Sequence, residues 1–303
     1  MKPRYEPLEL KIMRSLRVRM NLSAKDESYY VNLDKGYQGE QKFDKWLEPL
    51  SPDRLILNDL LLECNNSLFQ IDSLLITSNT IYLFEVKNYE GDFFIDADRW
   101  YSSSKIEIKN PLLQLSRNES LLRRMLQEFV FHLPIESYLI FVNPEFLLYQ
   151  ASLKLPIIFP AQLNRFLAKL KKSPSKINAS HSKFAEQLIS NHIEESPFNR
   201  LPDYEFDELE KGMSCLVCQT FYPSFPYKKY LICNSCSFRE DYQTAVLRNV
   251  EEFKTLFPNS KITTNTIHEW CGSIMSKRTI RNILLKSFKI IRHSNCSYYI
   301  DKD

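Results

Sequence analysis

Glycine is scarce in this sequence, at 5 of 303 residues. So few glycines argue against a Gly-rich phosphate-binding loop, and no Walker-type loop occurs, so an intrinsic ATP-driven motor is not expected. A run of about eighteen apolar residues is also absent, so no membrane span is expected. The formal net charge is only +3, so attraction for nucleic acid has to come from local patches rather than from the whole surface.

Histidine is rare as well, and the five histidines are dispersed without forming a metal pair or a Ser-His-Asp arrangement. The first nineteen residues carry Lys and Arg but no apolar core segment, so they do not form a secretory signal. The expected location is therefore the cytoplasm, which is reducing. Four of the seven cysteines form two Cys-x-x-Cys pairs, and in a reducing compartment this pattern indicates metal binding rather than disulfides.

The length predicts two or three folded units. We expect a charged lead-in with a short helix at 1–30, a mixed α/β domain at 31–195 and a linker at 196–211 that holds two prolines and five acids. A cysteine-containing zinc ribbon at 212–242 and a basic, helical, winged-helix-like domain at 243–303 follow. The predicted class is α/β, with a restriction-endonuclease-like mixed central sheet flanked by helices.

Within the α/β domain the residue pattern alternates between helix and strand. Residues 39–47 predict a helix with Phe43, Trp46 and Leu47 on one face. The remaining predictions are strands at 68–76 and 81–87 joined by a tight turn at 78–80, a helix at 110–126, and buried strands at 137–142 and 155–159.

Charged side chains interrupt the two hairpin strands. Glu85 and Lys87 are two residues apart, so they point to the same side of the strand, and a suitable register would bring Asp72 opposite Glu85. Apolar strands rarely tolerate such charges unless these have mutual or metal partners. The oxygens of Asp72 and Glu85, with the backbone carbonyl of Val86, suit Mg²⁺ or Mn²⁺. The alternative is an exposed ion pair between Glu85 and Lys87 on an edge strand.

Phosphodiester hydrolysis is the chemistry that suits this group. A bound metal ion would polarise the scissile phosphate and offset the growing charge. Lys87 would orient or help to deprotonate the attacking water and would neutralise the transition state, and Glu40 would bind the ion or its waters from the preceding helix.

An ordered series of motifs resembles the NERD (nuclease-related) domain, which is similar to the PD-(D/E)xK nuclease superfamily. The series consists of Gly36-Tyr37-Gln38-Gly39-Glu40, Ile71-Asp72, Glu85-Val86-Lys87-Asn88, Trp100, and Asn110-Pro111 followed by Gln114. The resemblance spans about residues 30–145. It implies catalytic roles for Glu40, Asp72, Glu85 and Lys87, with Gln114 facing the site from a following helix.

The four clustered cysteines are Cys215, Cys218, Cys233 and Cys236. Two Cys-x-x-Cys knuckles at this spacing predict a closed, tetrahedral, structural Zn²⁺ site in a zinc ribbon. An iron–sulfur cluster is the alternative.

The C-terminal segment predicts three short helices and a terminal hairpin that together resemble a winged helix. In the third helix, from Ser276 to Phe288, the apolar residues share one face. The opposite face presents Lys277, Arg278, Arg281, Asn282 and Lys286, which are the predicted DNA-binding residues. The alternatives are a solvated helix face and a winged helix that docks a protein.

Three hypotheses follow from these patterns. The first is a Mg²⁺- or Mn²⁺-dependent deoxyribonuclease delivered to DNA by its ribbon and tail. The second is a catalytically inactive DNA-binding or regulatory protein built on a nuclease-like scaffold. The third is an adaptor that docks a larger DNA-processing machine.

Overall fold

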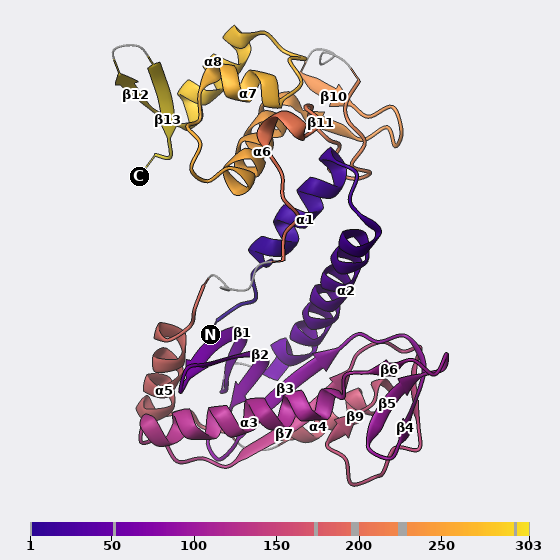
Figure 1. The fold of residues 1–303 in the computed structure, drawn as a ribbon. Coiled ribbons are helices and arrows are strands. Elements are labelled where there is room, and N and C mark those ends of the chain that lie inside the picture. The colour runs from indigo at the N-terminus through magenta and orange to yellow at the C-terminus, as the bar shows by residue number, and fades with distance from the viewer. Residues whose placement is uncertain are drawn as a thin grey trace. The chain divides into compact units, whose positions relative to one another are not determined.

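The computed structural model describes residues 2–50, 53–172, 175–194, 200–223, 229–293 and 296–302. It divides into two compact units, which are drawn in Figure 1. The first consists of Met1–Glu6 and Asn32–Phe198, and the second of Pro7–Val31 and Asn199–Asp303. Residues 196–199 of the predicted linker and 294–295 of the predicted terminal hairpin lie outside the described residues. No helix formed by the described residues is long and apolar enough to cross a membrane.

A five-stranded mixed sheet forms the centre of the first unit, with the strand order β1-β2-β3-β7-β9. Its first three strands pair antiparallel, whereas β7 and β9 run parallel to β3. A parallel neighbour requires a crossover connection, and α3 lies on the chain between β3 and β7. The bounds are β1 Leu55–Cys64, β2 Ser67–Ile76, β3 Ile81–Lys87, β7 Ile135–Phe141, β9 Ile157–Ile158 and α3 Pro111–Glu128.

Helices cover both faces of this sheet. On one face, residues of α3 and α5 (Ala179–Ser190) share a buried cluster with Leu83 of β3. On the other face, residues of α2 (Ala24–Leu47) and α4 (Leu163–Lys172) pack with the neighbouring Phe84. Figure 1 shows α3 running across the sheet. The predicted mixed α/β fold, with its central sheet flanked by helices, is confirmed.

A second sheet of the first unit was not predicted. Its strand order is β6-β5-β4-β8, and Trp100 of β5 is buried against the main core. The predicted helix at 39–47 is the end of the much longer α2. The remaining bounds of this unit are β4 Gly91–Asp96, β5 Arg99–Ser102, β6 Glu107–Ile108, β8 Phe146–Tyr149 and the 3-10 turns η1 Glu48–Leu50 and η2 Pro160–Gln162.

The described part of the second unit contains an N-terminal helix, the cysteine knuckles, three further helices and a terminal hairpin. Ser276 caps α8, accepting a hydrogen bond from the Thr279 N–H as an N-cap serine does. The bounds are α1 Leu8–Arg19, η3 Phe206–Glu208, β10 Tyr230–Ile232, β11 Arg239–Asp241, α6 Tyr242–Leu256, α7 Thr264–Trp270, α8 Lys277–Ser287, β12 Lys289–His293 and β13 Cys296–Ile300.

One buried cluster runs through the whole second unit. It joins Leu16 of α1, Cys215 and Cys233 of the knuckles, Val250 of α6 and Trp270 of α7. The lead-in expected at 1–30 therefore contributes a full helix to this core. The predicted boundary between the zinc ribbon and the helical tail stays a prediction. Buried side chains of the two segments belong to one continuous cluster.

Arg19 anchors α1 in this core with a fully buried side chain. Its guanidinium donates to Glu252 at 2.6 Å and to Asn249 Oδ1 at 3.1 Å. It also donates to the carbonyls of Glu210 and Gly212, and it lies 3.7 Å from the centre of the Trp270 ring. A buried cation with this many partners holds several segments of the chain together.

Replacing Arg19 by methionine is expected to lower the free energy of unfolding of the second unit by about 3–5 kcal/mol, because Glu252 loses its buried partner. Chemical denaturation followed by tryptophan fluorescence measures this loss. Arg17→Met is the matched control, since Arg17, on the same helix as Arg19, forms an exposed ion pair with Glu27 of α2, and its replacement should cost less than about 1 kcal/mol. Equal effects of the two substitutions would contradict the anchoring role.

Candidate functional site

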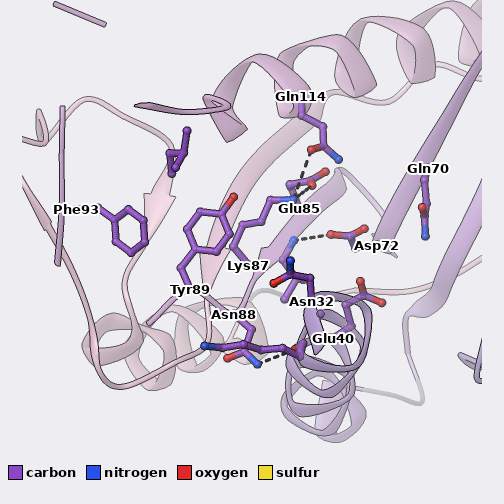
Figure 2. A pocket seen from close by; sticks show the side chains of 14 residues that line it. Asn32, Glu40, Gln70, Asp72, Glu85, Lys87, Asn88, Tyr89, Phe93 and Gln114 are labelled. Carbon is purple, nitrogen blue, oxygen red and sulfur yellow. Dashed lines mark hydrogen bonds and ion pairs between the residues drawn. The ribbon is translucent and has the colours of Figure 1, made fainter. Parts of the chain in front are cut away.

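A pocket of ≈ 560 Å³ lies in the first unit, between α2, the middle of β2, the end of β3, and α3. All the residues predicted to be catalytic line it, namely Glu40, Asp72, Glu85, Lys87 and Gln114, and so does Val86. Figure 2 shows these side chains arranged around one space, with Gln114 coming from the helix above. The structure therefore brings together residues that lie up to 74 positions apart, from 40 to 114.

The hairpin register places the two strand acids side by side. The pairing of β2 with β3 reaches Ser73 and Phe84, and Asp72 and Glu85 come directly after that pair. The Val86 N–H donates to Asp72 Oδ2 at 2.7 Å. Asp72 Oδ1 has no hydrogen-bond partner among the described residues, so one oxygen of a buried carboxylate is available to a ligand.

Lys87 forms an ion pair with Glu85, at 2.7 Å between Nζ and Oε1. The Glu85 side chain is 1% exposed and that of Lys87 is 19% exposed, so this is not the solvated edge-strand pair considered as the alternative. Lys87 also donates to Gln114 Oε1 at 3.4 Å. Gln114 thereby fixes the position of the ammonium group from α3.

Asn118 and Arg4 belong to the site but were not predicted. Asn118 lies one helical turn after Gln114 and donates to Glu85 Oε2 at 3.3 Å, so the i, i+4 spacing could have revealed it. Arg4 donates to Glu40 Oε2 at 2.5 Å, to Asp44 at 2.9 Å and to the Asp72 carbonyl at 2.6 Å. No motif in the sequence connects Arg4 to these residues.

Burial dominates the electrostatics of the pocket. It raises the pKa of Glu85 to about 8, with a further contribution from the charge of Asp72 and an opposing one from Lys87. Burial also raises the pKa of Glu40 to about 8, where Asp72 adds to the effect and Arg4 opposes it. The pKa of Asp72 is raised by burial too, against Lys87 and the Val86 N–H. Glu40 and Glu85 therefore lack enough nearby positive charge to stay fully ionised at neutral pH.

The pKa of Lys87 is raised, whereas burial alone would lower the pKa of a lysine. Burial favours its neutral form, but the charges of Glu85 and Asp72 outweigh burial and raise its pKa. Lys87 is therefore a firmly held cation at neutral pH.

The raised carboxyl pKa values predict how stability depends on pH. Glutamates of the unfolded chain titrate near pKa 4.3, so between pH of about 5 and 8 the folded state binds more protons than the unfolded state. Without added Mg²⁺ or Mn²⁺, the free energy of unfolding should therefore fall as pH rises through this window. Thermal melts of the zinc-loaded protein without added Mg²⁺ or Mn²⁺ across the pH series measure this fall. Glu85→Gln should flatten the slope, and a Tm that rises throughout the window would contradict the expectation.

The donor set fits a divalent cation. Carboxylate oxygens are the ligands that Mg²⁺ and Mn²⁺ prefer, and the pocket offers them buried and short of positive charge. Glu40, Asp72 and Glu85 do not place three ligand atoms within 4.8 Å of one another among the described residues. The predicted set of Asp72, Glu85 and the Val86 carbonyl needs only two carboxylates.

The four predicted zinc ligands do converge. The sulfurs of Cys215, Cys218, Cys233 and Cys236 all lie within 4.8 Å of one another. The sulfurs of Cys215 and Cys236 are 3.6 Å apart, and those of Cys218 and Cys233 are 3.4 Å apart. A tetrahedral zinc with Zn–S bonds of about 2.3 Å requires sulfurs roughly 3.8 Å apart, so the cluster is compatible with zinc.

The two knuckles share one backbone conformation. Gln219 and Ser237, each directly after the second cysteine of its knuckle, have φ of 63° and 59°. The Gln219 N–H donates to the Cys215 carbonyl at 3.0 Å, and the Ser237 N–H donates to the Cys233 carbonyl at 2.9 Å. Two equivalent tight turns thus aim four thiols at one point, which is how a zinc ribbon holds its ion.

A smaller pocket of ≈ 460 Å³ lies in the second unit at the start of α8. It contains three of the predicted DNA-binding residues, Lys277, Arg278 and Arg281, together with Thr264 and Tyr299. The other two, Asn282 and Lys286, do not line this pocket. The structure thus gathers the basic residues at the first turns of the helix beside the terminal hairpin.

The family comparison agrees with the first unit. Residues 35–142 match the family model of the nuclease-related domain, NERD. This range contains Glu40, Asp72, Glu85, Lys87 and Gln114. No curated protein and no solved structure matches the chain. The resemblance identified from the sequence is confirmed, and the chain carries a nuclease-related domain at residues 35–142.

Proposed function

We propose that this protein is a metal-dependent deoxyribonuclease that hydrolyses phosphodiester bonds in the pocket of the first unit. The observation that carries the proposal is the convergence of Asp72, in the middle of β2, with Glu85 and Lys87, at the end of β3. Buried acids beside a fixed ammonium group form the kind of site that phosphodiester hydrolysis with a divalent cation requires. The nuclease-related family match supports the same reaction class.

Asp72, Glu85 and the Val86 carbonyl are the proposed ligands of Mg²⁺ or Mn²⁺. When bound, such an ion supplies positive charge to the scissile phosphate and lowers the pKa of bound water. Asp72 keeps one oxygen available, and the Val86 N–H and Asn118 orient the two carboxylates. Glu40, held by Arg4, is the proposed partner of the ion or of its water.

Lys87 acts as a cation in this proposal. A general base has to be neutral, whereas the pKa of Lys87 is raised by Glu85 and Asp72. The raised pKa favours the predicted roles of orienting water and neutralising the transition state over the role of deprotonating water. Gln114 positions the ammonium group for this purpose.

The second unit would deliver the nuclease to DNA. Zn²⁺ held by the four cysteines would be structural, because protein sulfurs fill all four positions. The basic residues at the start of α8 would contact DNA phosphates, and Asn282 and Lys286 are the further proposed contacts on that helix.

DNA cleavage by the purified protein tests the proposal. We expect supercoiled plasmid and labelled oligonucleotides to be cut with Mn²⁺ or Mg²⁺ and to stay intact when the zinc-loaded protein is given neither ion. A complete lack of products over a broad range of metal ions and DNA forms would contradict the nuclease function.

The basic pocket at α8 favours a second candidate, a DNA-binding or adaptor protein in which the nuclease-like domain is a scaffold. In both candidates Arg278→Ala and Arg281→Ala should each reduce the slope of log affinity against log salt by about 1. Fluorescence anisotropy at several salt concentrations measures that slope. Lys25→Ala, at an exposed lysine of the same unit outside the pocket, is the control. Unchanged slopes in both arginine variants would contradict DNA contact at α8.

A further inference from the structure

Gly36 lies inside α2 and lines the pocket of the first unit. A glycine within a helix is less stable than an alanine because its backbone loses more conformational freedom on folding. A Cβ added at Gly36 would meet no heavy atom of the described residues within 4 Å. Packing therefore gives no reason for a glycine here.

Gly39, on the same helix, provides the contrast. A Cβ at Gly39 would lie 2.5 Å from the Asn88 Cβ and 3.2 Å from Val142, so close packing of the helix on the chain explains this glycine. The open space over Gly36 instead faces the pocket that contains the acids. A bare stretch of helix backbone beside a reaction site allows a ligand to approach closely.

The two walls of the pocket differ in chemistry. The α2 wall presents Asn32 and Lys35 next to Gly36, and Lys35 forms an ion pair with Glu90 at 2.7 Å that leaves 39% of the lysine side chain exposed. The other wall presents Tyr89 and Phe93, whose rings stack with centroids 5.4 Å apart. Figure 2 shows the two rings side by side on the far side of Lys87 from α2.

A polar wall that carries a lysine, facing an aromatic wall, is a combination that suits single-stranded nucleic acid, because backbone phosphates follow the first and unpaired bases stack on the second. Pockets of this size hold one drug-sized ligand, which corresponds to one nucleotide rather than to a duplex. Bases inside a duplex could not reach the aromatic rings without being unpaired.

We propose that the pocket takes an unpaired DNA strand, with its sugar–phosphate backbone passing over Gly36 and a base against the surface of Tyr89 and Phe93. This inference rests on the proposed nuclease function and deepens it by naming the substrate class, which is single strands, frayed ends and flaps. Gly36 and Tyr89 are positioning residues in this account.

The first test compares the affinity for one labelled oligonucleotide as a single strand and as its blunt duplex. All proteins carry Arg278→Ala and Arg281→Ala, so that the proposed tail contacts do not dominate, and binding is measured without added divalent cation and again with Ca²⁺. We expect the single strand to bind roughly tenfold more tightly.

Gly36→Leu should weaken single-strand binding at least about tenfold, because its side chain fills the path of the strand. Since leucine is a good helix former, Tm should not fall and should rise by up to about 2–4 °C. Gly39→Ala should lower Tm instead, and Gln41→Ala, at an exposed position of α2 outside the pocket, should change neither quantity.

A second pair of variants examines the aromatic wall. Tyr89→Leu should remove most of the preference for the single strand, whereas Tyr89→Phe, which keeps the ring, should retain it. Thermal melts of both variants show whether the fold is kept.

Equal binding of single strand and duplex by the parent protein, or unchanged single-strand affinity in a folded Gly36→Leu variant, would overturn the inference. The proposed function fails separately. A protein that prefers single strands through Gly36 but cuts no DNA would refute the nuclease and keep the strand path. A protein that cuts duplex as readily as single strand, at a rate unchanged by Gly36→Leu, would refute the strand path and keep the nuclease function.

Discussion

Lys87→Ala is expected to reduce the rate of DNA cleavage by about 10²–10³, which is the usual cost of removing one preorganised charge from a reaction site. The ammonium group lies 2.7 Å from Glu85, and its side chain is 19% exposed, so bulk solvent cannot replace it. A second cation near the acids, Arg4, is engaged by Glu40 and Asp44. Without Lys87, Glu85 should also hold its proton more tightly, which weakens binding of a divalent ion.

Single-turnover cleavage with saturating protein measures this effect free of product release. Lys42→Ala is the matched control, because Lys42 is an exposed lysine of α2 that does not line the pocket, and it should leave the rate unchanged. Thermal melts should show that Lys87→Ala remains folded, since a protonated Glu85 keeps its hydrogen bond with Asn118. Cleavage at the parent rate by Lys87→Ala would remove the reason for assigning the reaction to this pocket.

Removal of the metal from the four-cysteine cluster is expected to unfold much of the second unit. Zinc bound by four thiolates contributes on the order of 10 kcal/mol to folding in small modules. Cys215 and Cys233 belong to the same buried cluster as Val250 and Trp270, so loss of the metal site should disturb α6 and α7 as well as the knuckles. Cys233→Ser should have the same effect as a strong chelator.

Metal analysis of the purified protein should find one zinc per chain, and circular dichroism should show helix loss on chelation. Cys271→Ser is the matched control, because Cys271 is buried in the same core but lies outside the cluster of ligands. It should retain zinc and most of its helix content. An iron–sulfur chromophore, or a second unit that stays folded without metal, would contradict the structural zinc site.

Local pattern was sufficient to predict much of the first unit. The hairpin of β2 and β3 and the helix α3 follow from apolar runs, a tight turn and the Asn110-Pro111 start. Because side chains alternate along a strand, Glu85 and Lys87 were expected on one side, and both line the pocket. These features depend on neighbours in sequence, which is why they could be predicted.

The side chains of β2 do not alternate strictly between the two faces of the sheet. Phe69 and Ile71 join the same buried cluster as Leu74, so the spacing changes from two residues to three across Asp72. On the partner strand β1, Asp59 has a φ of 54° between the pairs that flank this position. A local backbone distortion of this kind has no clear signature in the sequence, because aspartate adopts positive φ only in some contexts.

Long-range contacts account for the other omissions. Arg4 reaches Asp72 across 68 positions, and Arg19 reaches Glu252 across 233. Both residues lie in a segment that was expected to be a charged lead-in. Their partners are set by tertiary packing, so no periodicity or motif near positions 4 and 19 could have indicated them.

The most direct measurement is a crystal structure of the protein soaked in Mn²⁺, with anomalous scattering used to locate the ion. We predict one anomalous peak within coordination distance of Asp72, Glu85 and the Val86 carbonyl, and its loss in Asp72→Ala crystals. A pocket without such a peak at Mn²⁺ concentrations that support cleavage, or a peak bound elsewhere, would contradict the metal-dependent reaction proposed for this site.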